Sequence, residues 1–186
     1  MHKNLEMYVK VYKEHIDPAF CQQVVKDLEA AKFEIHTFYD VVTNTSRSYD
    51  KELSTSYENV TGYKDLHTQT WEGIKRYVEE LGFPWWNAWS GFTKIRFNQY
   101  QSGTQMKEHC DHIHSMFDGN RKGIPTLSIV GVLNEDYEGG EFIMWQDRAI
   151  TLKTGDLLIF PSNFLYPHRV NEVTKGTRNT FVSWVW

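Results

Sequence analysis

The C-terminal half of the chain consists of short β-rich runs separated by turn residues, and this pattern restricts the possible folds most strongly. After Gly91 there are five to eight runs rich in β-branched and aromatic residues, among them residues 91–100, 126–134, 139–145, 148–152, 156–160, 168–173 and 178–186. Gly139-Gly140 and the turn at residues 154–156 are predicted to form hairpins between such runs. Many short strands joined by tight turns are typical of a β-sandwich or barrel-like sheet.

Two helices are predicted before this β-rich part. Asp17 and Pro18 match an N-cap followed by proline at the first helical position, and apolar residues continue at helical spacing to about Ala31. Residues 71–81 form a second amphipathic pattern, which Gly82 ends. Helices followed by a series of strands predict an α+β fold in which the N-terminal helices buttress the sheet.

The remaining N-terminal segments are expected to be extended or irregular. Residues 7–12 and 33–42 carry the composition of short strands. Residues 43–62 are polar and aperiodic, and we expect a long surface loop there. Loops of that length in compact domains are often functional lids.

The composition predicts one folded domain over residues 1–186. Hydrophobic residues make up 40% of the chain and aromatic residues 15%, which supports a packed core. A net charge of −4 gives no electrostatic indication of nucleic-acid binding. Because the N-terminus lacks a signal-peptide pattern and no run reaches the length of a transmembrane helix, we expect a cytoplasmic protein without a membrane partner. Cys21 and Cys110 are expected to be reduced.

Three residues carry the strongest chemical signal. His109 and Asp111 lie two positions apart, so on an extended strand their side chains face the same way. His168, 57 residues beyond Asp111, would complete a 2-His-1-carboxylate set if a neighbouring strand brought it alongside. This set is the usual ligand set of non-haem Fe(II) oxygenases and leaves positions open for reactants. Arg178, ten residues further on, adds a cation that can clamp a carboxylate.

The same residues also have simpler explanations. A chain with eight histidines contains an H-x-D triplet easily by chance. His112 and His114 lie in the same stretch and leave metal binding of another kind open. A histidine next to Pro167 is usually a loop residue, and Arg178 alone would suit a surface ion pair. The joint pattern of the four residues favours the iron site over these explanations.

The wider pattern extends through three groups of residues. They are Tyr100, Gly103, Met106, His109 and Asp111; then Leu133, Asn134, Gly139, Gly140, Glu141, Ile143 and residues 154–160; then Pro167, His168, Val170, Val173, Gly176, Arg178 and Trp184. Together they resemble the Fe(II)- and 2-oxoglutarate-dependent oxygenases, and within them the prolyl 4-hydroxylase-like branch. The resemblance is strong over about residues 90–186. It implies a double-stranded β-helix (jelly-roll, cupin-like) core, with N-terminal helical support over about residues 1–90 and a catalytic β core over about residues 91–186.

The resemblance also implies a cofactor set and roles for the residues. His109, Asp111 and His168 would hold Fe(II), with three positions left for 2-oxoglutarate and dioxygen, and ascorbate is a candidate reductant. Arg178 would pair with the distal carboxylate of 2-oxoglutarate. Side chains bonded to the free nitrogen of each ligand histidine are expected to fix its tautomer. Many relatives have an aromatic residue where this chain has Met106, so no role is assigned to that position.

Further residues are expected around the cosubstrate. Trp184 lies six positions after Arg178, so on one strand the two share a face, and Trp184 would form a pocket wall. Tyr100 matches a position where a tyrosine hydroxyl can contact the cosubstrate, although both aromatic residues would also suit core packing. Hydroxyl groups that could add hydrogen bonds are those of Thr126, Ser128 and Thr180.

The function implied is hydroxylation of a C–H bond, with succinate and carbon dioxide as coproducts. The favoured substrate is a peptidyl proline hydroxylated at C4, with residues 43–62 folded over an extended peptide. The same chemistry on a free amino acid, another small molecule or a nucleobase stays open. So do a non-enzymatic jelly-roll metal-binding module and a zinc hydrolase. The sequence does not indicate an oligomeric state.

Overall fold

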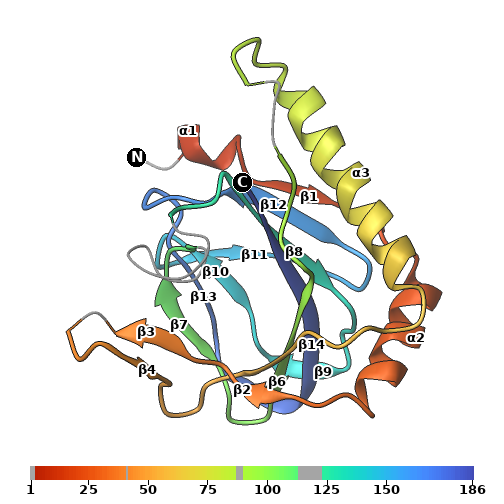
Figure 1. The fold of residues 1–186 in the computed structure, drawn as a ribbon, viewed down its shortest axis with the longest axis vertical. Helices are drawn as coiled ribbons and strands as arrows, with labels where there is room; N and C mark the ends of the chain where they lie inside the picture. Colours follow the sequence, from red (N-terminus) through yellow and green to blue (C-terminus); the bar gives the residue numbers. More distant parts are fainter. Residues whose placement is uncertain (1–2, 41, 87–89, 113–122) are drawn as a thin grey trace.

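The computed structural model describes residues 3–40, 42–86, 90–112 and 123–186, and it consists mainly of antiparallel sheet with the two longer helices on one side (Figure 1). The elements before residue 91 are α1 Lys3–Glu6, β1 Lys10–Tyr12, α2 Pro18–Leu28, β2 Glu34–Ile35, β3 Phe38–Asp40, β4 Thr45–Arg47, β5 Ser54–Ser56 and α3 Tyr63–Leu81. Those after it are β6 Arg96–Gln101, β7 Met106–His109, β8 Leu127–Val132, β9 Tyr137–Gly139, β10 Phe142–Met144, β11 Arg148–Ile150, β12 Leu157–Pro161, β13 His168–Val170 and β14 Val173–Val185. The expected α+β content is confirmed.

Two sheets make up most of the structure. The major sheet has the strand order β1-β12-β8-β14-β6-β5-β2. The strand β9 pairs with the first residues of β14. The minor sheet has the order β11-β10-β13-β7, and β3 and β4 form a separate hairpin. Every pairing between these strands is antiparallel. The part before residue 91 thus supplies β1, β2 and β5 to the major sheet in addition to the helices.

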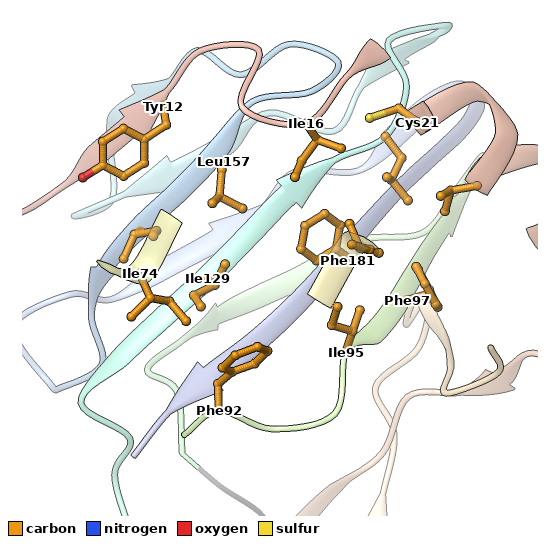
Figure 2. Close-up of a cluster of buried hydrophobic side chains, with 14 of the residues drawn as sticks. Tyr12, Ile16, Cys21, Ile74, Phe92, Ile95, Phe97, Ile129, Leu157 and Phe181 are labelled. Carbon is orange, nitrogen blue, oxygen red and sulfur yellow. The ribbon is translucent and has the colours of Figure 1, made fainter. Parts of the chain in front are cut away.

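The long strand β14 separates two hydrophobic clusters, because its side chains alternate between the two faces of the major sheet. Phe181 and Val185 pack with residues of α2 and α3, such as Cys21 and Ile74, in the cluster that Figure 2 shows. Val182 belongs to a second cluster, which residues of the major and minor sheets form together. One face of the major sheet therefore contacts the helices, and the other faces the minor sheet.

The helix ends follow the local sequence. The Asp17 side chain accepts hydrogen bonds from the backbone N–H of Ala19 at 2.7 Å and of Phe20 at 3.0 Å, which confirms the predicted N-cap. The second predicted helix is α3. It ends at Gly82, whose φ of 61° is left-handed, as the sequence predicts. It begins at Tyr63, eight residues before the periodic pattern at 71–81, because Leu66 and Thr70 extend the buried face.

Two turn predictions are wrong. The strands on either side of Gly139-Gly140 do not pair with each other, since β9 pairs with β14 and β10 pairs with β11 and β13. The turn at residues 154–156 likewise joins β11 of the minor sheet to β12 of the major sheet. These glycine turns carry the chain between sheets, and turn composition alone does not distinguish such a crossing from a hairpin.

The expected loop at residues 43–62 is also wrong in part. It contains β4, which pairs with β3, and β5, which pairs with β2 and β6. The predicted strand at 33–42 is divided into β2 and β3, which join different sheets. Strands of two or three residues are too short to show a periodicity of two in the sequence.

Two expectations about composition can be compared with the structure. Cys21 and Cys110 are both free thiols, as predicted. None of the helices in the described ranges is long and apolar enough to cross a membrane.

A substitution at Gly131 tests how closely β8 and β14 approach on the helix side of the sheet. Gly131 lies directly opposite Phe181, and a Cβ atom there would be 2.0 Å from Cε1 of that buried ring. We expect Gly131→Ala to lower the free energy of unfolding by about 1–3 kcal/mol, measured by urea denaturation, because the ring cannot withdraw without disturbing the core. The double variant Gly131→Ala/Phe181→Leu should recover part of the loss, and an unchanged single variant would contradict the packing described here.

Candidate functional site

The structure brings His109, Asp111 and His168 together at the edge of the minor sheet. His109 ends β7 and His168 begins β13, and the two residues are direct cross-strand partners with ring centroids 4.4 Å apart. Asp111 follows β7 by two residues. Its Oδ1 lies 3.3 Å from His109 Nε2 and 3.7 Å from His168 Nε2. The three donor atoms lie within 4.8 Å of one another, as the ligands of one metal ion do.

Both histidines have the same orientation relative to the backbone. His109 Nδ1 lies 2.8 Å from the carbonyl oxygen of Lys107, and His168 Nδ1 lies 3.1 Å from that of Tyr166. Since a carbonyl only accepts, each Nδ1 carries a proton and donates it, so each Nε2, which faces the other two donors, is the nitrogen left to bind a metal. The expectation that side chains fix these tautomers is therefore wrong: the backbone two residues earlier does so in both cases.

A residue of the major sheet holds the third donor, Asp111, in position. Its Oδ2 accepts a hydrogen bond of 2.5 Å from the hydroxyl of Ser128 on β8. The Ser128 hydroxyl is also hydrogen-bonded to that of Ser162, and both serines are buried. Because a hydroxyl has one proton, Ser128 donates to the carboxylate and accepts from Ser162. Ser128 is one of the three residues whose hydroxyl the sequence offers to the cosubstrate, and the structure places it behind the metal-facing carboxylate.

Aromatic packing controls the charge of His168. The ring of Phe142 stacks on it with centroids 5.2 Å apart, and Phe160 meets it edge-on at 5.0 Å. Burial among these rings lowers the pKa of His168 to about 4, although Asp111 acts in the opposite direction. The imidazole is thus neutral at physiological pH, which is the form that binds a metal.

The other two donors have opposite shifts. For His109, burial lowers the pKa, but the hydrogen bond and charge of Asp111 outweigh it and raise the pKa above its usual value. For Asp111, burial raises the pKa, but the two histidines and the Ser128 hydroxyl together lower it well below its usual range. Asp111 is therefore ionised, and the site carries a negative charge that favours a cation.

A pocket opens beside the three donors, between the two sheets. Alternate positions of β6, β13 and β14 supply most of the residues that line it. The lining consists of Arg96, Asn98 and Tyr100 on β6; Met106 and His109 on β7; Ile129 and Val130 on β8; Phe142 on β10; His168 and Val170 on β13; Arg178, Thr180, Val182 and Trp184 on β14; and Asp111. Tyr100 and Arg178 are cross-strand partners and nearly fully buried, so they form the deep end. Trp184 and Arg96 are half-buried and lie at the open end.

Two buried polar atoms at the deep end have no hydrogen-bond partner among the described residues. Arg178 is 2% exposed, and its Nε forms no hydrogen bond. The hydroxyl of Thr180 is likewise buried without a hydrogen bond. The guanidinium lies 5.0 Å from the centroid of the Tyr100 ring. Burial raises the pKa of Tyr100, so its hydroxyl keeps its proton and can donate. These groups form a site for an anion with several acceptor oxygens.

The structure separates the remaining residues singled out in the sequence. Trp184 lines the pocket on the same face as Arg178, and Met106 also lines it. Thr126 is exposed and donates to the carbonyl of Val185, away from the pocket. His112 is exposed and does not join the metal-ligand group found among the described residues. His114 lies outside the described residues.

Sequence reasoning missed several pocket residues, chiefly Arg96, Asn98 and Phe142. The signal for the first two was present, because Arg96, Asn98 and Tyr100 occupy alternate positions of one predicted strand. Phe142 gave no such signal, since its strand is only three residues long and all three residues are buried.

Comparison with known proteins agrees with this geometry. The profile of the 2OG-Fe(II) oxygenase superfamily matches residues 95–186, the part of the chain that supplies all three donors and Arg178. The chain belongs to the 2OG-Fe(II) oxygenase superfamily. Within it, the chain resembles the PKHD-type hydroxylase of Idiomarina loihiensis, with 37% identity over 95 residues, 50% of this chain and 41% of that protein. The PKHD-type hydroxylase of Parvibaculum lavamentivorans is 44% identical over 97 residues, 50% of this chain and 42% of that protein. The chain thus spans less than half the length of these curated relatives.

Solved structures of superfamily members have the same fold over almost the whole chain. A Pseudomonas putida prolyl-4-hydroxylase superposes with a TM-score of 0.68 and 14% identity, covering 96% of this chain and 91% of that one. A Trichoplax adhaerens prolyl hydroxylase, solved in complex with a hypoxia inducible factor oxygen degradation domain peptide fragment, gives a TM-score of 0.65 and 16% identity, covering 96% and 83%. The expected prolyl 4-hydroxylase-like assignment is confirmed at the level of the fold.

The superfamily implies Fe(II) and 2-oxoglutarate, and the residues present fit both groups. The Nε2 atoms of two imidazoles and an ionised carboxylate match the facial ligand set of non-haem iron. The unpartnered Arg178 and Thr180 at the deep end suit the carboxylate of a diacid.

Removal of the Ser128 hydroxyl tests the role of the major sheet in metal binding. We expect Ser128→Ala to weaken Mn(II) or Fe(II) binding roughly 10- to 100-fold, because Asp111 loses the hydrogen bond that orients it. Isothermal titration calorimetry measures this affinity. Thr126→Ala, which removes a hydroxyl on the outer side near the start of the same strand, should leave metal affinity unchanged; equal effects of the two variants would contradict this role.

Metal affinity should also depend on pH in a defined way. Below the raised pKa of His109 the metal must displace one proton, so the apparent affinity should fall about tenfold for each pH unit. His168 should add no proton until the pH approaches its own pKa of about 4, and Asp111 stays ionised throughout. Calorimetry in buffers of different ionisation enthalpy counts the protons released, and release of two protons between pH 5 and 6 would contradict the neutral state of His168.

Proposed function

We propose that this chain is an Fe(II)- and 2-oxoglutarate-dependent dioxygenase that hydroxylates a C–H bond of a peptidyl residue, with proline as the favoured target and succinate and carbon dioxide as coproducts. The proposal takes the two facing sheets as a double-stranded β-helix and the chain as a single domain. His109, Asp111 and His168 would hold Fe(II). Arg178, Thr180 and Tyr100 would bind 2-oxoglutarate, with Trp184 as a wall.

The observation that carries the cosubstrate assignment is the buried guanidinium of Arg178. Among the described residues, no carboxylate lies within 4.0 Å of it, although a buried charge without a partner is strongly unfavourable. A bound dicarboxylate would supply the missing charge. The Thr180 hydroxyl on the same face would supply a further hydrogen bond to it.

The close approach of Gly140 supports the same assignment. A Cβ atom at Gly140 would lie 3.0 Å from Cδ of Arg178 and 2.9 Å from a methyl group of Val173, and its φ of 67° is left-handed. Glycine at this turn therefore leaves room for the arginine to extend along the floor of the pocket.

When bound, iron and 2-oxoglutarate supply oxidative decarboxylation coupled to oxygen insertion into a C–H bond. The residues of the chain prepare this chemistry. The Lys107 and Tyr166 carbonyls keep the Nε2 atoms of both histidines free, and Ser128 orients Asp111. Phe142 and Phe160 shield His168 from water. Arg178 would orient the cosubstrate from the deep end, so the reacting centre faces the open end.

The surroundings of β7 support an extended peptide as substrate. In the described part of the chain β7 pairs only with β13, so the strand that ends in His109 is an edge of the minor sheet. Tyr49, within the segment 43–62, lies beside this edge. Phe38 and Tyr49 stack with centroids 4.4 Å apart, and Lys107 Nζ on β7 lies 4.0 Å from the centroid of the Tyr49 ring. A peptide that bound beside the metal along this edge would lie next to this segment.

The first test is turnover. The chain with Fe(II), 2-oxoglutarate and ascorbate should form succinate with proline-containing peptides, and mass spectrometry should find a gain of one oxygen on proline. Turnover of a free amino acid or nucleobase instead would replace the peptide half of the proposal. Activity with Zn(II) and without 2-oxoglutarate would replace the whole proposal by a hydrolase.

Replacement of Arg178 tests the cosubstrate assignment. We expect Arg178→Met to weaken 2-oxoglutarate binding roughly 100-fold or more, because the diacid loses its buried charge partner. The readout is the charge-transfer absorption of the Fe(II)–2-oxoglutarate chelate during titration. Arg169→Met is the matched control, because Arg169 lies on β13 outside the pocket lining and is 3.8 Å from Glu108. Unchanged affinity in Arg178→Met would refute the assignment.

A further inference from the structure

We propose that Arg96 is a specificity-determining residue that binds a carboxylate group of the substrate at the open end of the pocket. The inference rests on the proposed function and narrows its substrate class. Arg96 begins β6 and lines the same pocket as the three metal-facing donors. The sequence resemblance assigned it no role.

The register of the sheet places the two pocket arginines at opposite ends of one face. Tyr100 is paired with Arg178, and Arg96 is paired with Val182, four residues further along β14. Four residues of strand correspond to about 13 Å. A five-carbon diacid that chelates the metal and ends at Arg178 does not extend to Arg96. Arg96 is therefore left for a second ligand, on the side from which a substrate enters.

The ion pairs of the other arginines show how unusual this position is. In the part of the chain that the structure describes, four arginines lie within 4.0 Å of a carboxylate: Arg47, Arg76, Arg148 and Arg169. Arg96 and Arg178 do not, and both line the pocket. One is at the deep end, where the cosubstrate is expected, and the other is at the open end. These two cations, which have no carboxylate partner among the described residues, thus match two separate anionic ligands.

The Arg96 side chain is already held in position. Its Nε donates to Oδ1 of Asn98 at 3.0 Å, and its Cζ lies 4.8 Å from the centroid of the Trp184 ring. Its remaining guanidinium nitrogens form no hydrogen bond with any described residue, while the residue is half-buried. A guanidinium fixed on one side and free on the other loses little entropy when it binds a planar anion.

A carboxylate fits this site better than a phosphate. One guanidinium can form two parallel hydrogen bonds to a carboxylate and balance its single charge. A phosphate dianion would need further cations, and among the described lining residues the only other arginine or lysine is Arg178 at the deep end. The carboxylate could belong to an acidic side chain close to the hydroxylated residue, or to the α-carboxyl group of a free amino acid or C-terminal residue.

The test uses matched pairs of probes with the chain loaded with Mn(II) and 2-oxoglutarate. The first pair is a set of short proline-containing peptides with Asp or Glu, against the same peptides with Asn or Gln. The second pair is C-terminal acids and free amino acids, against their amides. Binding is measured by ligand-observed NMR or calorimetry. Preference within the first pair assigns the carboxylate to a side chain, and preference within the second assigns it to the main chain.

The expected result is a preference for the acid of roughly 10- to 100-fold that Arg96→Met removes, while the affinity for the amide stays unchanged. Arg96→Lys should keep part of the preference, because it retains the charge without the planar fork. Lys94→Met is the matched control: it removes one positive charge from an exposed residue two positions earlier that does not line the pocket. It should leave the preference intact.

Three results would overturn the inference. They are equal binding of acids and amides, a preference that Arg96→Met does not change, and tighter binding of phosphorylated probes than of carboxylates. Titration of 2-oxoglutarate into the Fe(II) protein is measured separately. If 2-oxoglutarate fails to bind, the proposed function fails; if it binds normally in wild type and Arg96→Met while substrate charge has no effect, only the role of Arg96 fails.

Discussion

The pairing of β7 with β13 is the interaction on which the site depends. It makes His109 and His168 direct neighbours across two strands, so two of the three donors converge by backbone hydrogen bonding alone. The third donor needs a second contact. Asp111 lies beyond the end of β7, and the Ser128 hydroxyl on the major sheet holds it against the two imidazoles. The site therefore forms only when the two sheets face each other at the right separation, and it joins the sheets as well as binding a metal.

The chemistry of the pocket follows from the alternation of side chains along β6 and β14. Their inward positions carry the polar groups, from Arg178 and Tyr100 at the buried end to Arg96 and Trp184 at the open end. The burial of each position suits a different task. Where water is excluded, a cation without a protein partner favours binding of a small diacid. Where water has access, a cation is inexpensive to maintain and can select among larger ligands.

The donor residues could be found in the sequence because their spacing reflects strand geometry: two positions for His109 and Asp111, and an even spacing for Arg178 and Trp184. The helices α2 and α3 could be found because caps and periodicity are local, whereas α1, only four residues long, was not predicted. The crossings at Gly139-Gly140 and Gly155 could not, since turn residues show where a chain bends but not which strand it joins. The role of Ser128 could not be predicted either. It arises from a contact with Asp111, which lies 17 residues earlier in the sequence and beside the other sheet.

The division of β14 between two environments has a consequence for how such a chain diverges. Phe181 and Val185 on one face pack in the cluster with the helices, and the even-numbered residues 178–184 on the other face line the pocket. Substitution of the pocket-facing residues can change ligand choice while the packing against the helices stays intact. Substitution of the helix-facing residues would change the thermal stability without changing ligand binding. Selection on chemistry and selection on folding thus act on interleaved, nearly independent halves of a single strand.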